Sequence, residues 1–323
     1  MLDEHEPPFS SEPNRNGGDD GGTDETASDE DAVAAAETVV DGDLRKPIRT
    51  LGDLVVRGNI RENLRAAVGG RLQVVGWILS GSELYVAGDV EVLGGIETSN
   101  LHVDGSLSAA ILDGCTVRVG QALNVQERIQ DCDICVLGPV AVPDGQIVGG
   151  QIIATDFVTC ETLGESPRQL QRRDSQHPRT TVVQISRSAA RELFEIDLDM
   201  RISDAEAAVA QMEHLWQPLL EDEGEQQGFS EEERAELELR KKQIKQARER
   251  LAQLEQRYRT LEQHVRDRTS RSPRISIGKA LYPGAEVRMW DRALRFRKTV
   301  EGPVTVSPTY QPPAEAVWGE EGA

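Results

Sequence analysis

The chain has 323 residues and a formal net charge of −20, and only 38% of its residues are hydrophobic and 4% aromatic. This composition is thin for two packed domains, so part of the chain is predicted to lack a core. No apolar run approaches the roughly 18 to 20 residues of a membrane span, and the N-terminus lacks the basic and apolar regions of a secretory signal. We therefore expect no integral membrane segment and a protein that stays in the compartment where it is made.

The N-terminal region holds much of the negative charge. Its first 46 residues carry 14 acidic side chains against Arg15, Arg45 and Lys46, a net charge of −11. Low hydrophobicity, high charge and many glycines leave too little apolar surface to offset the entropy of ordering. Residues 1–48 are therefore predicted to be a disordered acidic tail, which we interpret as a solvated spacer rather than a docking arm.

A repeat of alternating apolar residues followed by glycine fills the next part of the chain. Copies start at Leu54, Leu72, Leu84, Leu101 and Ile134, and a shifted copy starts at Val117. Apolar residues at every second position turn one face of a strand inward, and glycine lets the chain bend tightly at the next corner. The corner glycines predicted in this way are Gly58, Gly76, Gly88, Gly105, Gly120 and Gly138.

Repetition at a short period is typical of a solenoid, in which each coil pairs with its neighbours. We predict a mainly β fold, a single-stranded right-handed parallel β-helix over residues 49–187. A left-handed hexapeptide solenoid is the nearest alternative, because several glycines are six residues apart. We disfavour it because apolar positions are not expected to recur every six residues through the loops, and separations of 12 and 16 residues break that rule. A phosphate-binding loop is rejected because no G-K-[ST] sequence follows a strand.

A change of period at Ser188 predicts helices. Two apolar seams with helical spacing follow, and the second keeps a seven-residue repeat over more than four heptads. Between them, Gly224 and Gly228 supply a turn, and Ser230 with Glu233 form a capping box. Residues 188–270 are thus predicted to be an inserted antiparallel α-helical coiled-coil hairpin. Its seam consists of Leu198, Ile202, Val209, Met212, Trp216, Leu237, Ile244, Leu251, Tyr258 and Val265.

The strand pattern returns after the helices. The sequence "ISIGKAL" at Ile275 to Leu281 is similar to "VRVGQAL" at Val117 to Leu123. Residues 271–306 are therefore predicted to be return strands that complete the β-helix. Residues 307–323, rich in proline and glutamate, are predicted to be a disordered C-terminal tail.

The order of these parts is similar to that of a known family. The glycine-cornered strands, "IVGGQIIATDFVTCETLG" at 147–164, the strand "TTVVQI", the helical insertion and the closing "ALYPGAEVRM" resemble the flagellar assembly protein A family over about residues 49–300. The resemblance implies a right-handed β-helix with a helical insertion and a cytoplasmic location. It also implies a part in flagellar or cell-envelope assembly through protein contacts, and it brings no catalytic residues.

Four cysteines are candidates for metal or redox chemistry. Cys132 and Cys135 form a C-x-x-C pair, but residues three apart on a strand point to opposite faces and cannot share a metal without a bulge. We expect Cys132 to pack in the core beside Cys115, 17 residues earlier, and Cys135 to face outward. No metal site is predicted from them or from Cys160.

The remaining polar residues do not form an enzyme signature. The five histidines are scattered without an HExxH or HxxxH spacing, and we expect them, including the outward-facing His102, to be solvated. Asp131 and Asp133 are the carboxylate pair that acid–base chemistry along a β-helix groove would use. We predict no catalytic residue, no cofactor-binding residue and no metal ligand.

One basic stretch near the C-terminus is a candidate binding surface. It consists of Arg288, Arg292, Arg295, Arg297 and Lys298, with Trp290 and Phe296 between them. Arginine beside aromatic residues is typical of surfaces that bind phosphates or single strands. We instead favour an outward strand face of alternating arginines, because the acidity of the whole chain disfavours nucleic acid as a partner.

These observations favour a non-enzymatic scaffold that binds proteins through β-helix surfaces and a coiled-coil arm. Its expected partners are envelope or motility components on the cytoplasmic side, peripheral to the inner membrane or at the cell pole. Self-association through the coiled coil or the open solenoid ends is a further expectation. One alternative is a solenoid enzyme of the acyltransferase or lyase kind, which converging carboxylates or a buried histidine would support. Another is a basic-patch binder of nucleic acid or lipid.

Overall fold

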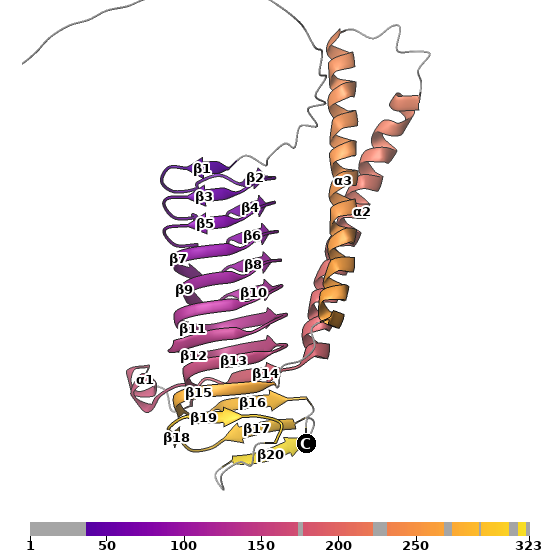
Figure 1. Ribbon diagram of the computed structural model, residues 1–323. Helices are drawn as coiled ribbons and strands as arrows, with labels where there is room; N and C mark the ends of the chain where they lie inside the picture. Colours follow the sequence, from indigo (N-terminus) through magenta and orange to yellow (C-terminus); the bar gives the residue numbers. More distant parts are fainter. Residues whose placement is uncertain are drawn as a thin grey trace, which may run out of the picture. The chain divides into compact units, whose positions relative to one another are not determined.

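The computed structural model describes residues 37–173, 177–221, 231–267, 273–290, 292–309 and 316–320. The described residues all belong to one compact unit, Ala35–Ala323. Within it the strands wind into a stack of coils (Figure 1). Two long helices are inserted in the chain between two of these strands. The strands are β1 (Thr38–Val40), β2 (Ile48–Thr50), β3 (Leu54–Val56), β4 (Arg65–Val68), β5 (Leu72–Val74), β6 (Glu83–Val86), β7 (Val90–Glu97), β8 (Asn100–Val103), β9 (Leu107–Asp113), β10 (Thr116–Val119), β11 (Leu123–Val136), β12 (Val140–Ala154), β13 (Phe157–Leu163), β14 (Thr181–Ile185), β15 (Arg274–Leu281), β16 (Ala285–Met289), β17 (Arg292–Phe296), β18 (Val300–Glu301), β19 (Val304–Val306) and β20 (Ala316–Glu320). The helices are α1 (Pro167–Arg172), α2 (Arg187–Glu221) and α3 (Glu231–Asp267).

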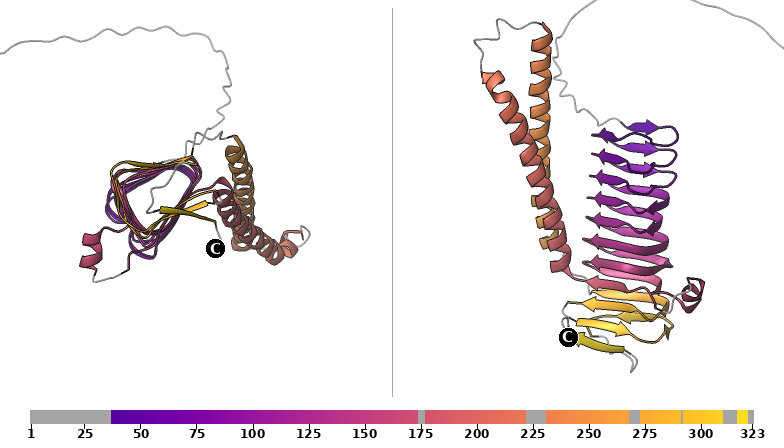
Figure 2. Two further views of the ribbon diagram at one scale, coloured as in Figure 1. Left: turned by 90° about the horizontal axis from the view of Figure 1, so that it is seen from below. Right: turned by 180° about the vertical axis from the view of Figure 1, so that it is seen from behind.

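Each coil has three sides, which give the stack a triangular section (Figure 2). Parallel pairing of β1, β3, β5, β7 and β9 builds the first side, which continues through the starts of β11 and β12 to β13 and β15. Parallel pairing of β2, β4, β6, β8 and β10 builds the third side, which continues through the ends of β11 and β12 to β14 and β16. Single bridges between Leu44, Ile60, Ile78 and Ile96 begin the second side. The predicted parallel β-solenoid is thereby confirmed.

The core residues of the early coils recur every six residues, one for each side of the triangle. Buried at this step are Leu54, Ile60, Ala66, Leu72, Ile78, Leu84, Val90 and Ile96. The expectation that apolar positions would not recur every six residues is therefore wrong for these coils. The 12-residue separation is also explained: Leu72 lies on the first side and Leu84 on the third side of a single coil, because they pair with Leu54 and Leu101 respectively. The right-handed winding stays a prediction.

Glycines lie where successive corners stack at close range. The Gly76 backbone N–H donates to the Gly58 carbonyl at 3.0 Å, and a Cβ on Gly76 would lie 2.7 Å from that oxygen. Beside it, the Asn59 side chain accepts a hydrogen bond from the Trp77 backbone N–H at 2.8 Å. A larger residue at position 76 would thus force neighbouring coils apart. Gly58 and Gly76 lie between the first and second sides, whereas Gly88, Gly105, Gly120 and Gly138 lie between the third and first sides.

The solenoid starts earlier than predicted. The sequence placed residues up to 48 in the acidic tail, but Thr38–Val40 forms β1 and pairs in parallel with Leu54–Val56. Thr38 and Val40 follow the same alternation as the later strands, and their acidic neighbours obscured it in the sequence. Residues 1–36 lie outside the described part of the chain, so the predicted disorder there stays a prediction.

The insertion consists of α2 and α3, which lie side by side (Figures 1 and 2). Arg248 of α3 forms an ion pair with Glu213 of α2, with Nε and Oε1 2.7 Å apart. α2 continues through Pro218 to Glu221. The predicted turn at Gly224 and Gly228 lies outside the described residues.

The stack ends in antiparallel strands. After β15 and β16 continue the parallel coils, β17 pairs antiparallel with β16, and β18 and β19 pair antiparallel with β15. β20 then pairs antiparallel with β17. The prediction of a disordered tail over 307–323 is therefore wrong for Ala316–Glu320, because the edge of β17 offers this short segment backbone partners.

Candidate functional site

The helices meet the solenoid on the outward surface of its third side. Cys135, Leu137 and Ile153 of the solenoid pack against Ala190 and Phe194 of α2, and all five side chains are buried. We call this cluster the arm anchor. It is separate from the solenoid core, whose side chains lie inside the coils. The arm anchor is thus the apolar contact that holds the base of α2 to the solenoid.

An aromatic ladder extends from the arm anchor along the third side. His102 on β8 is the register neighbour of Tyr85 on β6, and their ring centroids lie 6.4 Å apart. The edge of the Phe194 ring meets His102 at 5.8 Å between centroids, and the Arg201 guanidinium lies 4.8 Å from the centroid of the Tyr85 ring. Aromatic and cation–π contacts of this kind stabilise a contact beyond the apolar area that it buries.

His102 is buried rather than solvated, so that expectation is wrong for this histidine. The parity prediction was sound, but α2 covers the outward side of β8 and leaves the residue 5% exposed. Its Nε2 lies 3.2 Å from Oδ1 of Asp104. A cavity of about 430 Å³ adjoins this pair, and its other wall includes Phe194, Gln253 and Gln256. A buried histidine is one of the features that would support the enzyme alternative.

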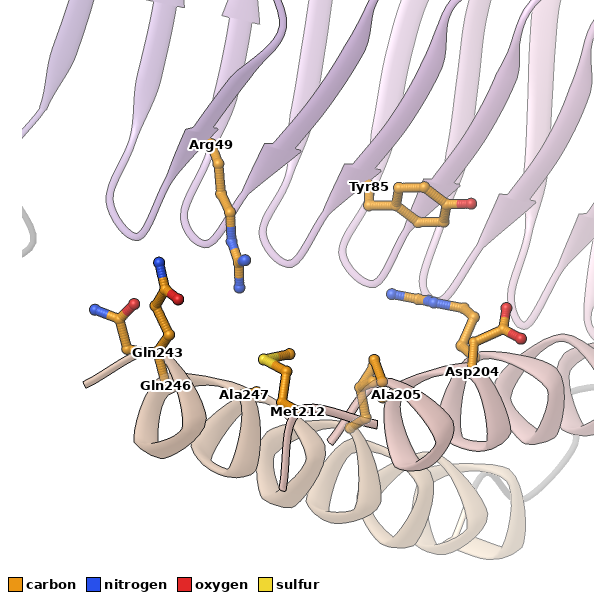
Figure 3. A pocket seen from close by; sticks show the side chains of 11 residues that line it. Arg49, Tyr85, Asp204, Ala205, Met212, Gln243, Gln246 and Ala247 are labelled. Atoms are coloured by element: carbon orange, nitrogen blue, oxygen red, sulfur yellow. The ribbon is translucent and has the colours of Figure 1, made fainter. Parts of the chain in front are cut away.

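A second cavity, of about 480 Å³, separates α2 and α3 from the first coils. Figure 3 shows the Arg49 side chain extending from the solenoid into this space and Met212 and Gln243 facing it from the helices. Tyr85 forms part of the solenoid wall. The helices are thus packed tightly at the arm anchor and loosely beyond it.

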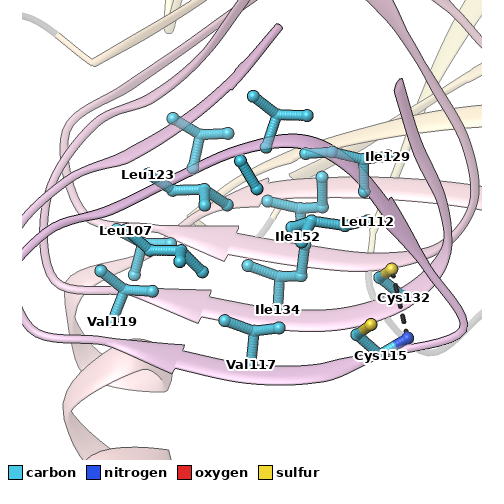
Figure 4. Packing of buried hydrophobic residues seen from close by; sticks show 14 of the residues in the cluster. Leu107, Leu112, Cys115, Val117, Val119, Leu123, Ile129, Cys132, Ile134 and Ile152 are labelled. Carbon is cyan, nitrogen blue, oxygen red and sulfur yellow. Dashed lines mark hydrogen bonds between the residues drawn. The ribbon is translucent and has the colours of Figure 1, made fainter. Parts of the chain in front are cut away.

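The cysteines are packing residues. Cys115 and Cys132 stack on adjacent coils inside the core, where the Cys115 backbone N–H lies 3.4 Å from Sγ of Cys132 (Figure 4). The hydrogen bond from Cys115 and burial raise the pKa of the Cys132 thiol. Cys135 faces outward but is covered by α2, and burial raises the pKa of its thiol to about 12. Burial likewise raises the pKa of Cys160 to about 12.

The two carboxylates considered for acid–base chemistry are each held by a different arginine. Asp131 lies 3.1 Å from Arg179, and Asp133 lies 3.3 Å from Arg118. Burial raises the pKa of Asp131 from its ordinary value, although Arg179 opposes the shift. Asp131 and Asp133 are therefore not arranged as an acid–base pair that acts on one substrate.

The basic stretch is partly neutralised. Burial acts to raise the pKa of Glu286, but hydrogen bonds from Arg288 and Arg295 outweigh it and hold that pKa below its ordinary value. The two Nε atoms lie 2.5 and 2.8 Å from its carboxylate oxygens. Arg292, Arg297 and Lys298 are exposed. The predicted patch thus contains two arginines that pair with Glu286, of which Arg295 is also exposed, and three further exposed basic residues.

The seam residues are described only in part. Leu198, Val209 and Ile244 are buried, while Ile202, Met212 and Leu251 are half-buried. The side chains of Trp216, Leu237, Tyr258 and Val265 lie outside the described part of the chain. Sequence reasoning missed Phe194, although its spacing of four residues from Leu198 is a helical signal that places both side chains on one face.

Within the described residues, no three His, Cys, Asp or Glu side chains lie close enough together to hold a metal ion. None of the helices in that part of the chain is both long and apolar enough to cross a membrane.

Three-sided parallel coils with an anchored helical insertion define a β-solenoid protein. Residues 47–308 match the family model described as the Flagellar Assembly Protein A beta solenoid domain. The chain therefore belongs to this family, as its sequence resemblance predicted. Comparisons with curated proteins and with solved structures found no match.

Proposed function

We propose that this protein is a non-enzymatic scaffold of flagellar or cell-envelope assembly. In this proposal the β-solenoid is a rigid mount, and α2 and α3 form an antiparallel coiled-coil hairpin, the arm, that binds protein partners. The observation that carries the proposal is the arm anchor, which fixes a helical insertion to a solenoid whose own core is already complete. Family membership supports the assembly context.

The helices have the properties of a protein-binding arm. α3 has 37 residues, which at about 1.5 Å per residue span about 55 Å. Val209, Ile244 and Leu254 are buried along α2 and α3, in keeping with a paired seam. Ile196 and Met200 are more than half exposed on α2. Because residues four apart share one helix face, these two side chains form a contiguous apolar pair that offers a partner protein a contact.

The polar residues support a role without catalysis. Asp131 and Asp133 are occupied by arginines, and all four cysteines are buried. The thiol pKa is raised in three of them, Cys132, Cys135 and Cys160. His102 and Asp104 favour the enzyme alternative, but His102 is also a packing partner of Phe194 in the arm contact. We place the protein in the cytoplasm, peripheral to the inner membrane or at the cell pole, with self-association through the arm or the solenoid ends.

Quantitative affinity purification from native cells tests this function. The full chain is compared with a variant in which residues 187–267 are replaced by a short linker, and an Arg172→Glu variant, changed at an exposed residue of α1, serves as a surface control. We expect flagellar or envelope proteins to be recovered with the full chain and the control and to be lost with the linker variant. Recovery of the same proteins without the helices would refute the arm as the recognition element. Recovery of no such protein with the full chain would refute the scaffold function.

A further inference from the structure

The cavity between the first coils and the arm has the chemistry of a peptide site. We call it the arm cleft. It is lined by Arg49 and Tyr85 of the solenoid, by Arg201, Asp204, Ala205, Ala208 and Met212 of α2, and by Gln243, Gln246, Ala247 and Leu254 of α3. Its volume of about 480 Å³ lies between two structural elements that are joined at the arm anchor.

The charge of the arm cleft is opposite to that of the chain. Its lining contains two arginines and one aspartate, whereas the chain as a whole carries 56 acidic and 36 basic residues. Arg49 is exposed and forms no ion pair with any described residue. A lining with a net positive charge on a strongly acidic protein favours an anionic partner over cationic ones.

The remaining walls are apolar or amide-bearing. Alanines at positions 205, 208 and 247, together with Met212 and Leu254, provide a small-residue surface on the helices. The carboxamides of Gln243 and Gln246 can donate to and accept from a peptide backbone. A flat lipid surface cannot enter a recess between helices and strands, whereas an extended or helical peptide can.

We infer that the arm cleft binds an acidic peptide segment of a partner protein. Its carboxylates pair with Arg49 on the solenoid, and its small apolar side chains contact the alanine surface of the helices. Because Arg49 and the alanines belong to different elements, the bound peptide also bridges the arm to the first coils. This inference rests on the proposed scaffold function and names the chemistry of one partner.

A binding assay on the full chain tests the inference. The probe is a fluorescently labelled peptide with glutamates every third position separated by alanines, and its isostere with glutamine at each glutamate is the matched control. We expect the glutamate peptide to bind in low salt, to bind at least tenfold more tightly than the glutamine peptide, and to weaken as salt increases. Absence of binding in low salt, or equal binding of both peptides, would overturn the inference.

Two full-chain variants locate the binding. Arg49→Glu should weaken binding of the glutamate peptide at least tenfold, and Ala208→Trp, which fills the cleft, should weaken it as well. Arg172→Glu, at an exposed arginine of α1 outside the cleft lining, should leave binding unchanged. If Arg172→Glu weakens binding as much as Arg49→Glu, the attraction is general and the assignment fails.

The remaining outcomes separate other occupants. Binding that is detected only after proteolytic removal of residues 1–36 would overturn a partner as the occupant and assign the cleft to the chain's own acidic sequence. Loss of peptide binding in Arg49→Glu with unchanged recovery of every partner from native cells would show that none of these partners uses the cleft, and would overturn a partner as its occupant. Failure of the probe to bind, with partner recovery intact, overturns this inference and leaves the scaffold function standing.

Discussion

Replacing Phe194 by alanine should release the arm without unfolding the solenoid. The side chain is 1% exposed and lies in the arm anchor rather than in the solenoid core. Removing a buried phenylalanine costs about 3–5 kcal/mol, the sum of lost burial and the cavity left behind. In Phe194→Ala this loss destabilises the contact between α2 and the third side of the solenoid. At about 1.4 kcal/mol per factor of ten, the arm should open about two to four orders of magnitude more often.

Hydrogen exchange measures this opening directly. Amides at the base of α2, near Ala190 and Phe194, should lose protection in Phe194→Ala, whereas amides of β8 to β12 should keep theirs. Met200→Ala is the matched control, because Met200 is on the same helix but 59% exposed. A loss of protection below tenfold, or an equal loss in the strands, would refute the reasoning that one cluster holds the arm.

Three further predictions follow from the packing. Gly76→Ala should lower the free energy of unfolding by about 1–3 kcal/mol, because its Cβ would lie 2.7 Å from a backbone oxygen, whereas Gly278→Ala, whose Cβ has no neighbour closer than 3.8 Å, should be nearly neutral in chemical denaturation. The pKa of the Cys160 thiol is about 12 in the folded state and 9.0 in the absence of burial. The raised pKa therefore stabilises the folded state fully below about pH 9, and this stabilisation is lost as the pH rises from 9 to 12. Between pH 9 and 12, the free energy of unfolding should therefore fall less steeply with pH in Cys160→Ala than in the unsubstituted protein, and the two slopes should differ by about 1.4 kcal/mol per pH unit. Glu286→Gln removes the carboxylate that two arginines share, so the variant should elute from heparin at higher salt; unchanged elution would contradict a neutralised patch.

The pattern of strands and corner glycines could be predicted from the sequence, but the pairing register of the strands could not. The pattern of two alternating apolar residues followed by glycine occurs on both the first and the third side, at Leu72 and at Leu84. A single copy does not reveal which side it occupies, because the side is defined by its partner one coil away. The spacing of the copies already indicated coils of 16 to 18 residues, and the pairing of the strands shows which copies are neighbours on one side.

The candidate site was harder to predict because it depends on contacts between distant segments. Strand parity placed His102 on the outer surface, and only the covering α2, some 90 residues later, makes it buried. The heptad seam was visible, whereas Phe194 lies off that seam and is defined by what it meets on the solenoid. Patterns along one element predict its faces, but they do not predict what covers each face.

The two ends of the stack differ in a way that limits how copies can join. At the C-terminal end, β17 to β20 run antiparallel and close the edge of the last coil. That edge therefore cannot serve as a template for another parallel coil. Of the two solenoid ends proposed for self-association, the first coil is thus the end that presents parallel strands, and two first coils that meet about a two-fold axis would form a closed pair rather than a filament.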